Sequence, residues 1–126
     1  MKEQHLAYRV IVADNEPSFS EWLCSLLEKS EDFEVVGQAC YCGEAIYLIV
    51  STKPDVIIVD IHMPEPDGLE VTRYVHRHLP DVKVILISAY EERIYEELAR
   101  EDGALAFIPK SKLSIDALLQ ALREEL

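Results

Sequence analysis

The stretch VIIVDIHMPEPDG, Val56 to Gly68, contains the end of one structural element and the start of the next. Four β-branched apolar residues lead to Asp60, which is the composition of a strand buried on both faces. The four residues from Asp67 to Glu70 have the types of a capping box, so a helix is expected to begin there. The stretch predicts a buried strand, a loop that opens with an acid, and a helix that returns over the sheet.

The same alternation continues in both directions along the chain. Short apolar runs alternate with amphipathic stretches, a pattern typical of a parallel sheet covered by helices. Five strands are predicted: Tyr8–Ala13, Phe33–Ala39, Val56–Asp60, Val82–Ser88 and Ala106–Pro109.

Each predicted strand is followed by a helical pattern. The helices are expected to begin at Pro17, cover Gly43–Ser51, begin at Asp67, cover Glu91–Glu101 and follow a cap at Ser114. The fourth helix has the weakest apolar pattern. The residues expected to face the sheet are Phe19, Trp22, Leu23, Leu26 and Leu27; Ala45, Leu48 and Ile49; Val71 and Val75; Ile94 and Leu98; and Ile115, Leu118, Leu119 and Leu122.

Composition limits the possible classes of protein. A chain of 126 residues with 49% hydrophobic residues is enough for one compact domain. Its 24 acids against 12 bases give a formal net charge of −12, which repels phosphate backbones and anionic lipid, so direct binding to nucleic acid or membrane is not expected. No apolar run reaches the ~18 residues of a membrane helix, and no signal peptide is recognisable, which indicates a cytoplasmic protein. The three cysteines, at positions 24, 40 and 42, lack zinc-site spacing and are expected to be reduced thiols.

The residues that end the strands carry the chemistry. In an open α/β sheet, ligands bind outside the carboxyl ends of the strands, where the loops converge. Carboxylates there would suit Mg²⁺, Asp60 could act as a nucleophile toward a phosphoryl group, Lys110 would offset charge on the transferring oxygens, and Ser88 would donate a hydrogen bond to one of them. The candidate residues are Asp14, Asn15 and Glu16 after the first strand, Asp60 at the end of the third, Ser88 at the end of the fourth and Lys110 at the end of the fifth.

At this point the sequence resembles the receiver domains of response regulators. The stretch from Val56 to Gly68 is similar to their phosphoacceptor segment, with Met63-Pro64 and Asp67-Gly68 at the expected spacing. The acidic pocket at Asp14, the pair Ser88-Ala89 and Lys110 follow in the family's order, and the similarity extends from about Tyr8 to Leu122.

The resemblance implies a flavodoxin-like, doubly wound α/β fold with five parallel strands in the order 2-1-3-4-5 and five helices. It implies one receiver domain over residues 1–126, with no output domain in this sequence. It also implies Mg²⁺-dependent phosphoryl transfer from a histidine kinase or phosphotransfer protein of a two-component system to Asp60. Such a domain is a phosphoacceptor, not a turnover enzyme.

The resemblance also assigns roles to individual residues. Asp14, Asp60 and the backbone carbonyl of His62 would hold the metal, with Asn15 or Glu16 as a further ligand. Ser88 and Phe107 would form the switch, and His62 and Tyr90 would lie at the rim. The readout face would be the fourth helix, fifth strand and fifth helix, which would also serve a homodimer. VVGQA and FIPKS resemble receivers that precede helix-turn-helix output domains, and so indicate transcription regulation.

Two departures from the family pattern keep alternatives open. Receivers usually carry two adjacent acids where this chain has Asp14 and Asn15, so a pseudo-receiver that binds partners without phosphorylation is the main rival. Glu16 could replace the missing charge, or it could simply complement the dipole of the first helix. In addition, Pro109 precedes Lys110 and Ser111 follows it, whereas proline follows the lysine in many receivers; a changed loop is expected.

Two enzyme or cofactor classes fit the sequence less well. A phosphatase with an aspartyl nucleophile would need a second acid two residues after Asp60, where this chain has His62. A nucleotide- or flavin-binding domain would need a glycine-rich loop after the first strand, and the sequence DNEPS contains no glycine.

Overall fold

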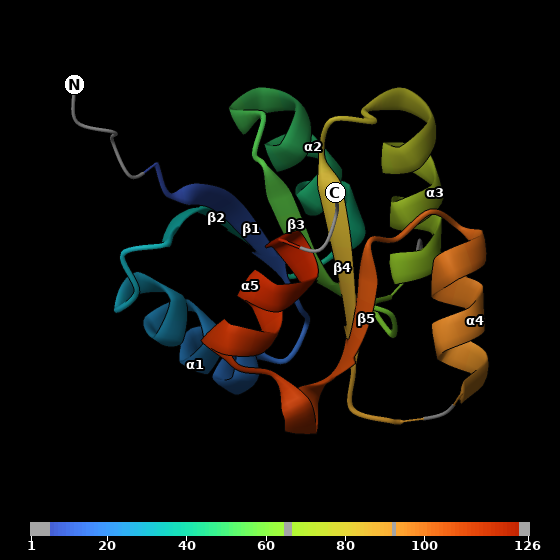
Figure 1. The fold of residues 1–126 in the computed structure, drawn as a ribbon. Helices are drawn as coiled ribbons and strands as arrows, with labels where there is room; N and C mark the ends of the chain where they lie inside the picture. The colour runs from blue at the N-terminus through green and yellow to red at the C-terminus, as the bar shows by residue number, and fades with distance from the viewer. Residues whose placement is uncertain (1–5, 65–66, 92, 124–126) are drawn as a thin grey trace.

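A parallel sheet of five strands forms the centre of the structure, a computed structural model that describes residues 6–64, 67–91 and 93–123 (Figure 1). The strands lie in the order β2-β1-β3-β4-β5, and every neighbouring pair is parallel. Along the chain the elements are β1 (Tyr8–Ala13), α1 (Pro17–Glu28), β2 (Phe33–Ala39), α2 (Cys42–Thr52), β3 (Val56–Asp60), α3 (Gly68–His78), β4 (Lys83–Ser88), α4 (Arg93–Glu101), β5 (Ala106–Pro109), the 3-10 turn η1 (Lys110–Lys112) and α5 (Ile115–Arg123). The predicted fold class and strand order are confirmed.

Two apolar layers, one on each face of the sheet, hold the fold together. Helices α1 and α5 pack on one face, and α2, α3 and α4 pack on the other (Figure 1). All five residues of β3 are buried, because this strand lies in the middle of the sheet with helices on both sides. Complete burial of one Ile or Leu side chain contributes about 1.5–3 kcal/mol, so this central strand is a major source of stability.

The predicted helix starts at Asp67 and Ser114 are confirmed by their caps. The backbone N–H of Glu70 donates to Asp67 Oδ1 at 3.0 Å, and the N–H of Asp67 donates to Glu70 Oε1 at 3.2 Å. At α5, Ser114 Oγ accepts from the N–H of Ala117 at 3.0 Å. Each cap satisfies backbone donors that the first turn leaves unpaired.

Two predicted inward-facing residues lie outside the core. Trp22 is 47% exposed, because the buried stripe of α1 passes through Leu23 and Leu27 and Trp22 lies about 100° away from Leu23. Ile94 is 50% exposed, for the same reason: the inward face of α4 is formed by Tyr95, Leu98 and Ala99 at helical spacing. Both predictions were wrong about the rotation of the helix.

Some predicted boundaries also differ by one or two residues. β4 begins at Lys83 instead of Val82, and α2 covers Cys42–Thr52 instead of Gly43–Ser51. α4 begins at Arg93; Glu91, predicted as its first residue, is not helical. β5 ends at Pro109, and Lys110 opens η1. That the loop differs from that of other receivers stays a prediction.

The three cysteines are free thiols, as predicted. Burial raises the pKa of Cys24 to about 11 and that of Cys42 to about 12, with nearby carboxylates adding to both shifts. Cys40 is exposed. Among the described residues, no helix combines the length and the hydropathy needed to cross a membrane.

Candidate functional site

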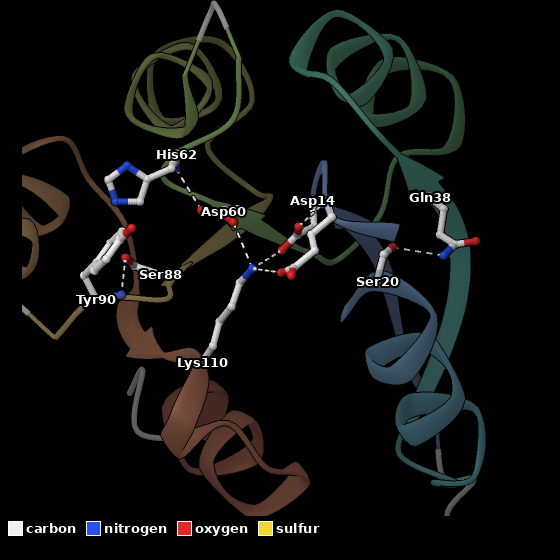
Figure 2. A network of polar contacts seen from close by, with 9 residues as sticks. Asp14, Ser20, Gln38, Asp60, His62, Ser88, Tyr90 and Lys110 are labelled. Carbon is white, nitrogen blue, oxygen red and sulfur yellow. Dashed lines mark hydrogen bonds and ion pairs between the residues drawn. The ribbon is translucent and has the colours of Figure 1, made fainter. Parts of the chain in front are cut away.

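Two acids and one lysine meet at the carboxyl ends of the strands. Asp14 follows β1, Asp60 ends β3, and Lys110 follows β5. The Nζ atom of Lys110 lies 2.8 Å from Asp14 Oδ2 and 3.0 Å from Asp60 Oδ2 (Figure 2). Asp14 and Lys110 are 96 positions apart in the sequence, with Asp60 between them. The fold brings the three residues together at one edge of the sheet, as expected.

The two carboxylates are held in the same way. The backbone N–H of Glu16 donates to Asp14 Oδ1 at 2.8 Å, and the backbone N–H of His62 donates to Asp60 Oδ1 at 2.8 Å. In each case the donor is two residues beyond the acid, so the loop that follows the strand fixes one carboxylate oxygen. The other oxygen of each acid is left facing Lys110 (Figure 2).

Two buried carboxylates in this cluster face one ammonium, so the negative charge exceeds the positive charge. Asp14 is 1% exposed and Asp60 is 6% exposed, and they share the single ammonium of Lys110. Loss of solvation raises the pKa of Asp14, and the negative charge of Asp60 adds to that effect, while hydrogen bonds from Lys110 and from the Glu16 backbone oppose it. Burial alone would lower the pKa of Lys110, but its hydrogen bonds to Asp14 and Asp60 outweigh burial and raise it. Lys110 is therefore a charged ammonium at neutral pH.

The side chain of Glu16 takes part in the same cluster. Its Oε1 atom lies 3.4 Å from Lys110 Nζ, although the side chain is 61% exposed. Glu16 occupies the N-cap of α1 without a side-chain cap bond, so its carboxylate is directed to the lysine instead of the helix end. Asn15, the residue that departs from the family pattern, is exposed.

The donor set fits a hard divalent cation. Mg²⁺ is usually held by one or two carboxylates together with water, and Asp14 and Asp60 provide two carboxylates at one mouth. The Oδ2 atom of Asp14 is buried, and among the described residues it has the Lys110 ammonium at 2.8 Å and no hydrogen bond from any other group. No group of three His, Cys, Asp or Glu side chains in the described ranges could hold a metal ion on its own. A magnesium site here would consequently depend on water and backbone ligands.

Ser88 and Tyr90 line the neighbouring part of the mouth. Ser88 ends β4 and is completely buried, and its Oγ accepts from the backbone N–H of Tyr90 at 3.0 Å (Figure 2). The strand register pairs Asp60 with Ile87, so Ser88 lies one residue beyond the level of Asp60 on the adjacent strand. Phe107, the predicted switch residue, is half-buried on β5, with its ring centroid 6.4 Å from that of Tyr95.

Gly68 packs directly on the backbone of the Asp60 segment. A Cβ atom at position 68 would lie 2.5 Å from the carbonyl oxygen of Asp60 and 2.8 Å from Cα of Ile61. The N–H of Gly68 also donates to the carbonyl of Ile61 at 3.2 Å. The Asp-Gly pair of the opening motif thus serves two purposes: Asp67 caps α3, and Gly68 lets the start of that helix approach the acid.

Two aromatic residues belong to the site although the sequence assigned them elsewhere. The ring of Phe19, predicted only as core, lies with its centroid 4.2 Å from Lys110 Nζ, within the range of a cation–π contact. Tyr95, which lies in the helix predicted as part of the readout face, has its ring centroid 5.0 Å from that of His62. Neither contact is signalled by spacing or composition in the sequence.

The family model for the response regulator receiver domain matches residues 10–123. The chain belongs to this family. The predicted family and fold are therefore both confirmed, and the receiver domain accounts for nearly the whole chain.

Relatives of this receiver domain include a transcriptional regulatory protein and an enzyme. It is 31% identical over 115 residues to the transcriptional regulatory protein DegU of Brevibacillus brevis, covering 91% of this chain and 48% of DegU. It is 39% identical over 127 residues to a protein-glutamate methylesterase/protein-glutamine glutaminase of Burkholderia thailandensis, covering 99% of this chain and 35% of that protein. The chain thus spans about half, or less, of the length of these two curated relatives.

A solved structure with the same fold is the signal receiver domain of the response regulator NarL from Mycobacterium tuberculosis. The two are 32% identical, with a TM-score of 0.84, over 92% of this chain and 97% of that one. The strand order of the receiver domain is accordingly that of a known structure with clear sequence similarity.

Proposed function

We propose that this receiver domain takes a phosphoryl group onto Asp60 from a histidine kinase or a phosphotransfer protein of a two-component system. The observation that carries the proposal is the buried Asp60 carboxylate, whose Oδ2 lies 3.0 Å from the ammonium that also contacts Asp14. A nucleophilic carboxylate needs positive charge close by when a phosphoryl group approaches, because charge spreads over the transferring oxygens.

The transfer is a substitution at phosphorus. A carboxylate oxygen of Asp60 forms the new bond to phosphorus, the bond from phosphorus to the donor's imidazole nitrogen breaks, and the electron pair remains on that nitrogen. Lys110 stabilises the charge on the phosphoryl oxygens, and the backbone N–H of His62 orients Asp60 through its Oδ1. Asp14 and Asp60 would hold Mg²⁺, with the backbone carbonyl of His62 and either Asn15 or Glu16 as further ligands, and the ion would supply additional positive charge.

The aspartyl phosphate would then act as a switch. Phosphorylation adds negative charge and three acceptor oxygens. The hydroxyl of Ser88 would donate to one of these oxygens, and Phe107 would repack as Ser88 moves. Both residues lie on strands next to α4, so the readout face would be α4, β5 and α5, which would also serve homodimers.

Several finer properties belong to the same proposal. The domain would be phosphorylated and dephosphorylated without turning over a substrate, and it would work in the cytoplasm with its kinase. The net charge of −12 disfavours contact with nucleic acid or anionic membrane, so any control of transcription would be exerted by an output domain outside this sequence.

Replacing Asp60 with asparagine is expected to abolish phosphorylation. Incubation of the wild-type protein with acetyl phosphate and Mg²⁺ should add one acid-labile phosphoryl group, detected by intact-protein mass, because the Asp60 carboxylate is the nucleophile. Asp81→Asn removes an exposed acid outside the site and is the matched control. An adduct of equal yield on Asp60→Asn, or no adduct on the wild type, would contradict the proposal.

A pseudo-receiver that binds a partner without phosphorylation is the second candidate, and Asn15 favours it. An amide oxygen brings no negative charge to a dication, so a site with Asn15 should bind Mg²⁺ less tightly than a site with a second acid at that position. We expect measurable Mg²⁺ binding by the wild type in calorimetry and tighter binding by Asn15→Asp. If only Asn15→Asp binds Mg²⁺, the pseudo-receiver becomes the better interpretation.

A further inference from the structure

Three aromatic rings from three separate segments meet at the rim of the site. The imidazole of His62 lies in the loop after β3, with its centroid 5.3 Å from the ring of Tyr90 and 5.0 Å from the ring of Tyr95. The interplanar angles are 88° and 81°, which are edge-to-face arrangements that aromatic rings prefer. His62 is exposed, and among the described residues these two ring contacts are the ones that give its ring a defined position.

The ring of His62 is directed toward Tyr90 and away from Lys110 (Figure 2). Its own backbone N–H holds Asp60 Oδ1, while Tyr90 is held to the buried Ser88 through its N–H. The two rings therefore form a wall beside Asp60 and Ser88, the residues between which the phosphoryl group of the proposed function would lie.

Tyr95 connects this wall to α4. It is half-buried in the first turn of α4, and its ring also lies 6.4 Å from that of Phe107 on β5. Among the described residues of α4, Ala99 alone is fully buried, so the helix is attached by little apolar surface. Weakly anchored helices are the ones that move at low free-energy cost.

We propose that Tyr95 is a positioning residue that holds the His62 ring against the mouth of the site, and that it thereby links the lifetime of the aspartyl phosphate to the position of α4. This inference rests on the proposed function. When α4 or Tyr95 is displaced, for example by a protein that binds α4, the His62 ring loses its contact with Tyr95 and water reaches the acyl phosphate more easily.

The first measurement compares hydrolysis rates. Wild type, Tyr95→Leu and Tyr95→Phe are loaded with acetyl phosphate, the donor is removed, and loss of the phosphoryl group is followed by intact-protein mass. Tyr95→Leu is expected to lose it about two to ten times faster, the range that one aromatic contact can account for, whereas Tyr95→Phe keeps the ring and should match the wild type.

The second measurement reports the position of the ring without any phosphorylation. The NMR signals of the His62 imidazole should move in Tyr95→Leu and stay in place in Tyr95→Phe. Tyr74→Leu is the matched control, since Tyr74 is a surface tyrosine of α3 whose ring lies 4.8 Å from that of His78. That variant should move the signals of His78, leave those of His62 unchanged, and hydrolyse at the wild-type rate.

Different outcomes overturn different claims. Unchanged His62 signals in Tyr95→Leu would show that Tyr95 does not hold the ring, and a wild-type hydrolysis rate in that variant would show that the ring does not protect the acyl phosphate. If the wild type accepts no phosphoryl group, the proposed function fails and the link to hydrolysis fails with it. The NMR comparison still decides whether Tyr95 positions His62.

Discussion

Gly68→Ala is expected to lower the free energy of unfolding by about 3 kcal/mol, at the upper end of the usual cost of overpacking. The added Cβ would lie 2.5 Å from the Asp60 carbonyl oxygen and 2.8 Å from Cα of Ile61, and both are backbone atoms. A flexible side chain could move aside, but here β3 or the start of α3 must shift. Urea unfolding of the variant and the wild type measures the loss.

Gly43→Ala is the matched control for this substitution. Its new Cβ would meet only the ring of Tyr41, at 3.4 Å, and Gly43 lies within α2. Alanine in a helix is favoured over glycine by roughly 0.5–1 kcal/mol, so this variant should be as stable as the wild type or more stable. Equal effects of the two substitutions would show that the contact between Gly68 and Asp60 does not restrict the packing of α3.

Removal of the lysine and removal of one acid are expected to have opposite effects on stability. Lys110→Met leaves Asp14 and Asp60 buried together without a cation, and loss of one partner from a buried ion pair typically costs about 3–5 kcal/mol. Asp14→Asn leaves one buried acid for one ammonium, and should stabilise the protein by about 1 kcal/mol at pH 7, as substitutions that relieve unfavourable functional groups commonly do. Thermal and urea unfolding in Mg²⁺-free buffer measure both.

The gain from Asp14→Asn should depend on pH. Burial raises the pKa of Asp14 in the folded protein above its ordinary value of 3.8. At a pH between 3.8 and the raised pKa, the folded wild type therefore binds more protons than the unfolded chain. The stability that Asp14 contributes is fully present below pH 3.8 and is lost as the pH rises through the raised pKa. The advantage of the variant should accordingly be largest at neutral pH and shrink on acidification. An advantage that grows on acidification would contradict this assignment.

The sheet could be predicted from the sequence because its central strand, β3, is buried on both faces. Val56 to Val59 form a continuous apolar run, and the end of such a run is visible without knowledge of packing, as at Asp60. Helix rotation was harder to predict. In α1 and α4 the apolar residues cover a wide arc, and a step of one residue turns the side chain by about 100°. Trp22 and Ile94 were for this reason predicted to face the sheet, whereas both are exposed.

The site was predictable to the extent that it follows from topology. Strand ends of a parallel sheet share one edge, so Asp14, Asp60 and Lys110 were expected together, and they are within ion-pair distance. The contacts of Phe19 with Lys110 and of Tyr95 with His62 depend on how helices far away in sequence pack against that edge. No spacing or composition rule contains that information, and an aromatic residue in an amphipathic helix is ordinarily part of the core.

The contact between Phe19 and Lys110 has a practical consequence for work on this molecule. The ring of Phe19 lies 5.5 Å from that of Trp22, and Trp22 is the one tryptophan in the sequence. Its indole is therefore two contacts away from the ammonium at the centre of the charged cluster. The chain thus carries its own fluorophore near the charged cluster, and intrinsic emission is expected to report, without a label, events that change the surroundings of Lys110.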